Sequence, residues 1–128
     1  VHFVGAVTQS VLTQYYAAAD VLVLASSREG WANVLLESMA CGTPVVATNI
    51  WGTPEVVSSP VAGRLADQRT SSSLVAALQS LMADYPDRRQ VRAYAEKFSW
   101  EETTRGQIDL FCKIIKGNPP SNGKLNHA

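Results

Sequence analysis

The sequence has little cysteine, little histidine and no net charge, and each shortage excludes a class of protein. The chain of 128 residues holds two cysteines and two histidines. Cys41 and Cys112 form no C-x-x-C pair and have no histidine at metal-ligand spacing, so we expect free thiols in a reducing compartment and no metal site. Eleven basic and eleven acidic side chains cancel. No overall field therefore draws the chain to nucleic acid or to an anionic bilayer.

Long apolar runs are also absent. None approaches the roughly 20 residues that span a bilayer, so we expect no transmembrane segment. Residues 1–5 begin inside an apparent strand, without an initiator Met or a charged leader. We therefore expect a piece of a longer cytoplasmic protein, and leave open whether the full-length parent is peripheral at a membrane.

Short apolar runs alternate with segments of helical periodicity along the chain. Such runs predict strands, and apolar residues three or four apart predict helices. Strands are predicted at 1–5, 21–25, 44–48 and 63–66, and helices at 8–19, 33–40, 54–57, 71–85, 88–98 and from 99 onward. The strand at 21–25 is expected to be covered on both faces of the sheet. Asn33 is the predicted N-cap of the helix through residue 40, Gly42 is its predicted stop, and Asp87 is the predicted cap of the helix that follows it. The alternation favours an α/β fold with a doubly wound parallel sheet. Because so few strands are present, we expect a partial Rossmann-like sheet, one half of the usual domain.

The chain divides into a domain and a tail. Residues 1–116 are predicted to form the folded domain. Residues 117–128 are rich in Asn, Pro, Ser, Gly and Lys, a composition that predicts disorder. The last helix carries an apolar stripe of Ile108, Phe111 and Ile115, which predicts an exposed patch and self-association through this helix.

Residues 26–37 carry the candidate chemistry. They join the carboxyl end of a predicted buried strand to a helix start, where open α/β sheets bind ligands. A helix start presents unpaired N–H groups and positive dipole, which suit phosphate, and Gly30 lets a ligand approach the backbone. Glu29 and Glu37 lie eight residues apart, and each carboxylate can accept from vicinal hydroxyls. Phosphate and hydroxyl recognition together indicate a nucleotide sugar.

Ordinary structural explanations compete with some of these roles. Arg28 is expected to pair with Glu29 rather than to hold phosphate. Trp31 and Trp51 either stack on a sugar or cover the core, and the second is the commoner use of loop aromatics. Without its surroundings, Glu37 would be read as an exposed helical carboxylate.

The string EGWANVLLESMACGTPVVAT at residues 29–48 resembles the E-x7-E signature, with its following helix and strand, of the retaining glycosyltransferase family 4, the glycosyl transferases group 1. Flanking matches occur at 16–20, 52–57, 63, 65 and 98–101, so that the resemblance covers residues 1–115. It implies the two-domain GT-B fold. The chain would be the second half of the C-terminal, donor-binding domain.

The resemblance also implies a role for each residue of the signature. Glu29 would be the catalytic residue, and Val34 and Glu37 would bind the nucleotide. Donor sugar and diphosphate would be bound by Glu29, Gly30, Trp31, Ala32 and Asn33. The full-length parent would be a hexosyltransferase of carbohydrate biosynthesis that transfers a sugar from a nucleoside diphosphate sugar with retention. No cofactor or metal is implied, and the sequence has no Asp-x-Asp motif.

The sequence departs from the family pattern at some positions. Ala25 stands where proline is common, and Trp51-Gly52 stands where a glycine pair is common. The basic residues that neutralise the diphosphate and the N-terminal acceptor domain of the parent chain have no counterpart here. We therefore expect the isolated chain to be inactive.

Two other functions stay open. Paired carboxylates roughly 5 to 10 Å apart hydrolyse glycosides, although a helix start suited to phosphate argues against this use. A non-catalytic nucleotide-binding or interaction domain is the second, because fold does not guarantee chemistry. The sequence leaves the base, the sugar and the acceptor undetermined, so that uridine, guanosine and adenosine donors all remain candidates.

Overall fold

The structure, a computed structural model, describes residues 1–116, except for the side chains of Trp100, Glu102 and Thr103. The predicted tail at 117–128 lies outside the described residues. The chain forms two compact units, Val1–Lys97 and a second that begins at Phe98. The assignment of residues 1–116 to one domain therefore stays a prediction.

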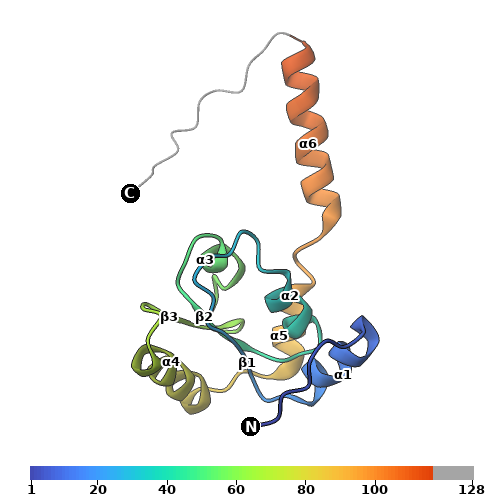
Figure 1. Ribbon diagram of the computed structural model, residues 1–128. Coiled ribbons are helices and arrows are strands. Elements are labelled where there is room, and N and C mark those ends of the chain that lie inside the picture. Colours follow the sequence, from blue (N-terminus) through green and yellow to red (C-terminus); the bar gives the residue numbers. More distant parts are fainter. Residues whose placement is uncertain (117–128) are drawn as a thin grey trace. The chain divides into compact units, whose positions relative to one another are not determined.

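The first unit is built on a three-stranded parallel sheet (Figure 1). The strands are β1 (Leu22–Leu24), β2 (Val45–Thr48) and β3 (Gly63–Ala66), in the order β1-β2-β3. Leu22 pairs with Val45, and Val45 with Gly63. All four residues of β2 are buried, as the apolar run predicts for a central parallel strand.

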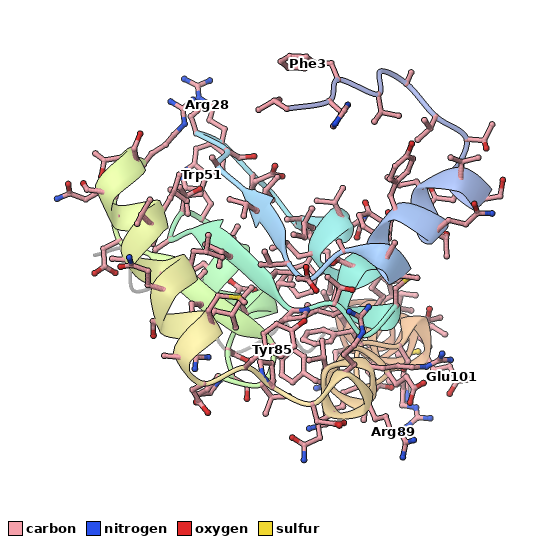
Figure 2. All side chains as sticks on the ribbon, turned by 90° about the horizontal axis from the view of Figure 1, so that it is seen from below. Phe3, Arg28, Trp51, Tyr85, Arg89 and Glu101 are labelled. Carbon is pink, nitrogen blue, oxygen red and sulfur yellow. The ribbon has the colours of Figure 1, made fainter. Side chains whose placement is uncertain are left out.

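Helices cover both faces of this sheet. They are α1 (Gln9–Ala18), α2 (Asn33–Ala40), α3 (Thr53–Val56), α4 (Ser71–Ala83) and α5 (Arg88–Ala95). α4 packs on β2 and β3, whereas α2 packs on β1 and β2 from the opposite face, with α1 and α5 against α2 (Figures 1 and 2). The arrangement confirms the predicted α/β fold with a doubly wound parallel sheet.

The core lies on the two sides of β2. Val46 packs with Ala66, Ala77 and Leu81 in a cluster beneath α4. On α2, Leu35 and Met39 are fully buried. Burying a side chain of this size contributes about 1.5–3 kcal/mol.

Two expectations about strands are wrong. Residues 1–5 form no strand, and Val1 and Phe3 are 109% and 96% exposed. The described sheet begins at β1 and gives this segment no ladder of hydrogen bonds, which an apolar run needs to become a strand. β1 is not covered on both faces, because Val23 is 46% exposed. Val23 pairs with Val46 and so lies on the face of the sheet that α4 covers. α4 packs on β2 and β3 rather than on β1, which leaves Val23 exposed.

The ends of α2 follow local signals, with a shift of one residue at its start. Asn33 is the first helical residue, and Ala32 holds the cap position that we predicted for Asn33. The predicted stop at Gly42 is confirmed. Gly42 has a φ of 81°, its N–H donates to the Met39 carbonyl at 2.8 Å, and the Thr43 N–H donates to the Ser38 carbonyl at 3.0 Å. This is the Schellman arrangement, which glycine enters without strain.

The later helices are also close to prediction. α4 and α5 begin where expected and end two and three residues earlier, at Ala83 and Ala95 rather than 85 and 98. Asp87 caps α5 through its carboxylate, which accepts from two backbone N–H groups. In the second unit, α6 (Trp100–Ile115) follows Ser99, and the predicted apolar stripe along it is exposed.

Candidate functional site

Three loops meet at the carboxyl edge of the sheet, because the ends of parallel strands lie at one edge. Thr48, the last residue of β2, donates from its hydroxyl to the Ser26 carbonyl at 2.7 Å. Arg69, which follows β3, donates from Nε to the Ala25 carbonyl at 2.8 Å. The loop after β1, which carries the candidate residues, is therefore held by the last residue of β2 and by the segment that follows β3.

The loops after β1 and β2 also touch directly. A Cβ added to Gly52 would collide with the carbonyl oxygen of Gly30. A glycine at 52 is thus required by close backbone approach, as the resemblance to a glycine-containing turn suggests. An added Cβ at Gly30 meets nothing within 4 Å among the described residues, so Gly30 leaves open space at its own position.

Trp51 occupies a backbone conformation that favours glycine. Its φ is 43°, in the left-handed region that side chains disfavour. The turn is fixed by Thr53, whose hydroxyl donates to the Thr48 carbonyl at 2.6 Å and accepts from the Ile50 N–H at 3.0 Å. Trp51 is 69% exposed and covers little of the core. A glycine, which is common at this position in the family that the sequence resembles, would adopt this φ without strain.

Glu29 is half-buried in the loop after β1. The Ser26 hydroxyl donates to its Oε1 at 2.7 Å. The expected pairing of Arg28 with Glu29 is wrong, since the ion pairs of the described side chains are Arg64–Asp84 and Arg92–Glu96. Arg28 is exposed and extends outward from the loop (Figure 2). The Ser26 hydroxyl therefore binds the Glu29 carboxylate, where we expected the Arg28 guanidinium.

Glu37 lies on α2 and is half-buried rather than exposed. The Tyr16 hydroxyl, from α1, donates to its Oε2 at 3.3 Å. Tyr16 is 7% exposed. Burial raises the pKa of Tyr16, and the charge of Glu37, the hydrogen bond to it and the charge of Cys41 raise it further.

The backbone around Tyr16 is fixed by hydrogen bonds from residues that follow α2 and begin α5. The Thr43 hydroxyl donates to the Tyr16 carbonyl at 2.6 Å. Arg88 of α5 donates to Thr43 Oγ1 at 2.7 Å, to the Ala17 carbonyl at 2.7 Å and to the Ala19 carbonyl at 2.9 Å. A cation at the last carbonyls of α1 is electrostatically favourable. α1, α2 and α5 are therefore joined beside Glu37.

The remaining predicted residues lie at the junction of this loop and α2. Ala32 is buried, Val34 is half-buried, and Asn33 is exposed. Trp31 is 46% exposed, so part of its ring is accessible at the same junction. The Asn33 N–H donates to the Trp31 carbonyl at 2.9 Å, and the Leu35 N–H to the Ala32 carbonyl at 3.0 Å. These bonds tighten the chain as it enters the helix.

Sequence reasoning missed the two hydroxyls that bind the glutamates. Ser26 lies three residues before Glu29, a spacing that could have suggested a local hydrogen bond. Tyr16 is 21 residues from Glu37, and nothing in the spacing of the two residues indicates their contact. No metal-ligand group of three or more His, Cys, Asp or Glu side chains is found in the described part of the chain. Within residues 1–116, no helix has the length and apolarity to cross a bilayer.

Comparisons with known proteins show the family and the fold of the chain. Residues 1–98 match the family described as glycosyl transferases group 1. A D-inositol 3-phosphate glycosyltransferase of Paenarthrobacter aurescens is 34% identical over 110 residues, 83% of this chain and 27% of that protein. Another, from Geodermatophilus obscurus, is 37% identical over 114 residues, 85% of this chain and 24% of that protein. The chain thus spans about a quarter of the length of the curated relatives it matches.

A solved structure shows the same fold. A sucrose-phosphate synthase from Thermosynechococcus elongatus superposes with a TM-score of 0.75 at 30% identity, over 91% of this chain and 31% of that one.

Proposed function

Since the chain belongs to the glycosyl transferases group 1, we propose that it forms the donor-binding part of a retaining glycosyltransferase, of hexosyltransferase type, that uses a nucleoside diphosphate sugar. The observation that carries this proposal is the pair of half-buried glutamates at the loop and helix that follow β1, each hydrogen-bonded by a hydroxyl. A carboxylate held in this way is pre-oriented to accept from further hydroxyls.

The proposal gives the donor three sets of contacts. Glu29 accepts from hydroxyls of the transferred sugar and is the catalytic residue. The chain from Gly30 to Asn33 faces the sugar and the diphosphate at the positive end of α2. Val34 and Glu37 contact the nucleoside, with Glu37 on the ribose hydroxyls.

In the reaction, the bond between the anomeric carbon and the diphosphate oxygen breaks, and the electron pair leaves with the diphosphate. The acceptor oxygen forms its bond to the same carbon on the same face, and its proton passes to the departing diphosphate. Most of the catalysis lies in stabilising the charge on the leaving diphosphate, which helix dipoles and cations do without covalent protein chemistry. The proposal includes no metal and no cofactor.

Transfer also needs an acceptor and closure over the donor. The proposal assigns acceptor binding to the N-terminal domain of the same parent chain. The present chain, alone, binds donor without turning it over. The alternative of a non-catalytic nucleotide-binding domain stays open for the isolated chain, which spans about a quarter of the length of these relatives.

Calorimetric titration of the chain with UDP, GDP and ADP tests the proposal. We expect one nucleotide to bind best, and Glu37→Ala to weaken it about tenfold, which is 1.4 kcal/mol. Glu96→Ala is the matched control, because Glu96 is an exposed carboxylate paired with Arg92.

Equal weakening by both variants would contradict the assignment of Glu37. If the wild-type chain bound none of the three, the same titration on the full-length parent would decide between an incomplete half-site and a wrong assignment. Release of monosaccharide from a simple glycoside by the chain, lost in Glu29→Gln, would instead support hydrolysis.

A further inference from the structure

A buried phenol lies beside Glu37, and no role in sugar transfer has yet been assigned to it. Tyr16 is 7% exposed, and its hydroxyl donates to Glu37 Oε2 at 3.3 Å. A buried tyrosine hydroxyl needs a partner. The partner here is one oxygen of the carboxylate that the proposed function places on the ribose.

The hydrogen bond divides the two oxygens of Glu37 between two tasks. Oε2 is engaged by Tyr16. Among the described residues, no hydrogen bond is formed by Oε1. A free glutamate samples several rotamers and loses that freedom when it binds a ligand. A carboxylate already tied at one oxygen has less to lose and presents the other oxygen in one direction.

We propose that Tyr16 is a positioning residue that orients the Glu37 carboxylate so that Oε1 is offered to the ribose hydroxyls of the nucleotide. The inference rests on the proposed function for its ligand, and on the contacts of α1 with α2 for its geometry.

The surroundings of Tyr16 suit a fixed support. Its carbonyl accepts from Thr43 at 2.6 Å, and Arg88 binds both Thr43 and the Ala17 carbonyl at 2.7 Å. The backbone of Tyr16 therefore cannot move away from Glu37 without breaking contacts to Thr43 and, through it, to Arg88 of α5. Burial of the side chain restricts rotation of the ring. The raised pKa of Tyr16 agrees with a phenol that keeps its proton toward a carboxylate.

The first experiment needs no ligand. Side-chain NMR couplings report the rotamer of Glu37 in the wild-type chain, Tyr16→Phe and Tyr15→Phe. Tyr16→Phe removes one oxygen and keeps the ring. Tyr15 is 48% exposed on the same helix and is the matched control. We expect a single Glu37 rotamer in the wild type and in Tyr15→Phe, and averaged couplings in Tyr16→Phe.

The second experiment uses ribose as the readout. The best-binding nucleotide of UDP, GDP and ADP is titrated beside its 2′,3′-dideoxy counterpart. We expect Tyr16→Phe to weaken the ribonucleotide about fivefold, in the range of one hydrogen bond, and to leave the dideoxynucleotide unchanged. In a Glu37→Ala background, Tyr16→Phe should cause no further loss, because the carboxylate that Tyr16 orients is then absent.

The outcomes separate the two proposals. Equal weakening of both nucleotides would show that Tyr16 acts only through packing, and the inference would be wrong. An unchanged Glu37 rotamer in Tyr16→Phe would overturn it as well, whether or not any nucleotide binds. Absence of all nucleotide binding in the chain and in the full-length parent, with a rotamer that does change, would overturn the ribose role and the proposed function together but keep the orienting contact.

Discussion

The carbonyl oxygen of Gly30 lies against the Cα of Gly52, so closely that a Cβ at position 52 would collide with it. This contact joins the loop after β1, which carries Glu29, to the loop after β2. Backbone meets backbone here, and neither side can yield by changing a rotamer.

Gly52→Ala should therefore be destabilising. We expect a loss of about 1–3 kcal/mol in the free energy of unfolding, the usual cost of forcing atoms into packed structure. Gly30→Ala is the control, because an added Cβ there meets nothing within 4 Å among the described residues. Urea denaturation measures both variants, and equal losses in the two would contradict the close approach.

Trp51 gives a second test of the same turn. Replacing alanine with glycine usually lowers the free energy of unfolding by about 0.5–1 kcal/mol, because glycine loses more conformational freedom on folding. At φ 43° the order should reverse, because a side chain costs roughly 1–2 kcal/mol in the left-handed region. We expect Trp51→Gly to be more stable than Trp51→Ala by about 1 kcal/mol in urea denaturation. If Trp51→Ala were the more stable variant, the positive φ at position 51 would be contradicted.

Much of this architecture was readable from local sequence. Three local signals gave predictions that the structure confirms: the apolar run of β2, the periodicity of α2 and the glycine at 42. Each depends only on residues close to it in the sequence. Residues 1–5 have the same apolar character as β2, but a strand also needs a partner to pair with. Pattern alone cannot supply that partner.

The site was readable to a similar degree. The glutamates and the helix start lie in one continuous segment, so their location at the sheet edge follows from the order of elements. The contacts of Tyr16 with Glu37 and of Arg88 with Thr43 join residues 21 and 45 positions apart. Such pairs depend on how α1 and α5 pack on α2, which periodicity does not determine. The ligand roles of the site residues stay predictions.

Ser26 offers a test of Glu29 that leaves the glutamate in place. Ser26→Ala removes the donor at 2.7 Å from Oε1, and the carboxylate gains freedom. We expect binding of a nucleoside diphosphate sugar to weaken about tenfold, since a hydrogen bond to a charged group contributes about 1.5–3 kcal/mol. Binding of the nucleoside diphosphate alone should change little, because it lacks the transferred sugar.

Ser27→Ala is the control for that variant, since Ser27 is the exposed neighbour. Calorimetry with both ligands separates the two effects. Equal weakening of the diphosphate and of the diphosphate sugar would mean that Ser26 supports the whole loop and not Glu29.

The raised pKa of Tyr16 predicts a loss of stability in alkali. Its folded pKa lies above that of the unfolded chain, because burial and Glu37 oppose ionisation. The resulting stability is full below a pH of about 10, the ordinary tyrosine value, and is lost as the pH rises through the folded pKa. Wild type and Tyr15→Phe should both show this decline in urea denaturation between pH 9 and pH 12, values chosen to bracket that range. Tyr16→Phe should show less of it, and an identical decline in all three chains would assign the effect to other groups.

The exposed stripe of α6 predicts self-association. Ile108, Phe111 and Ile115 are 54%, 59% and 83% exposed, and an apolar surface of this kind gains free energy when a second surface covers it. We expect the apparent mass in light scattering to rise with concentration, and Phe111→Glu to abolish the rise, because burying a carboxylate in an apolar interface is costly. Gly106→Glu adds the same charge where an added Cβ meets nothing within 4 Å in the described structure, on the opposite side of a regular helix, and should leave the association intact. A wild-type chain that stays monomeric at high concentration would show that the stripe does not bind a second copy, and equal loss in both variants would show that added charge, not this stripe, controls the association.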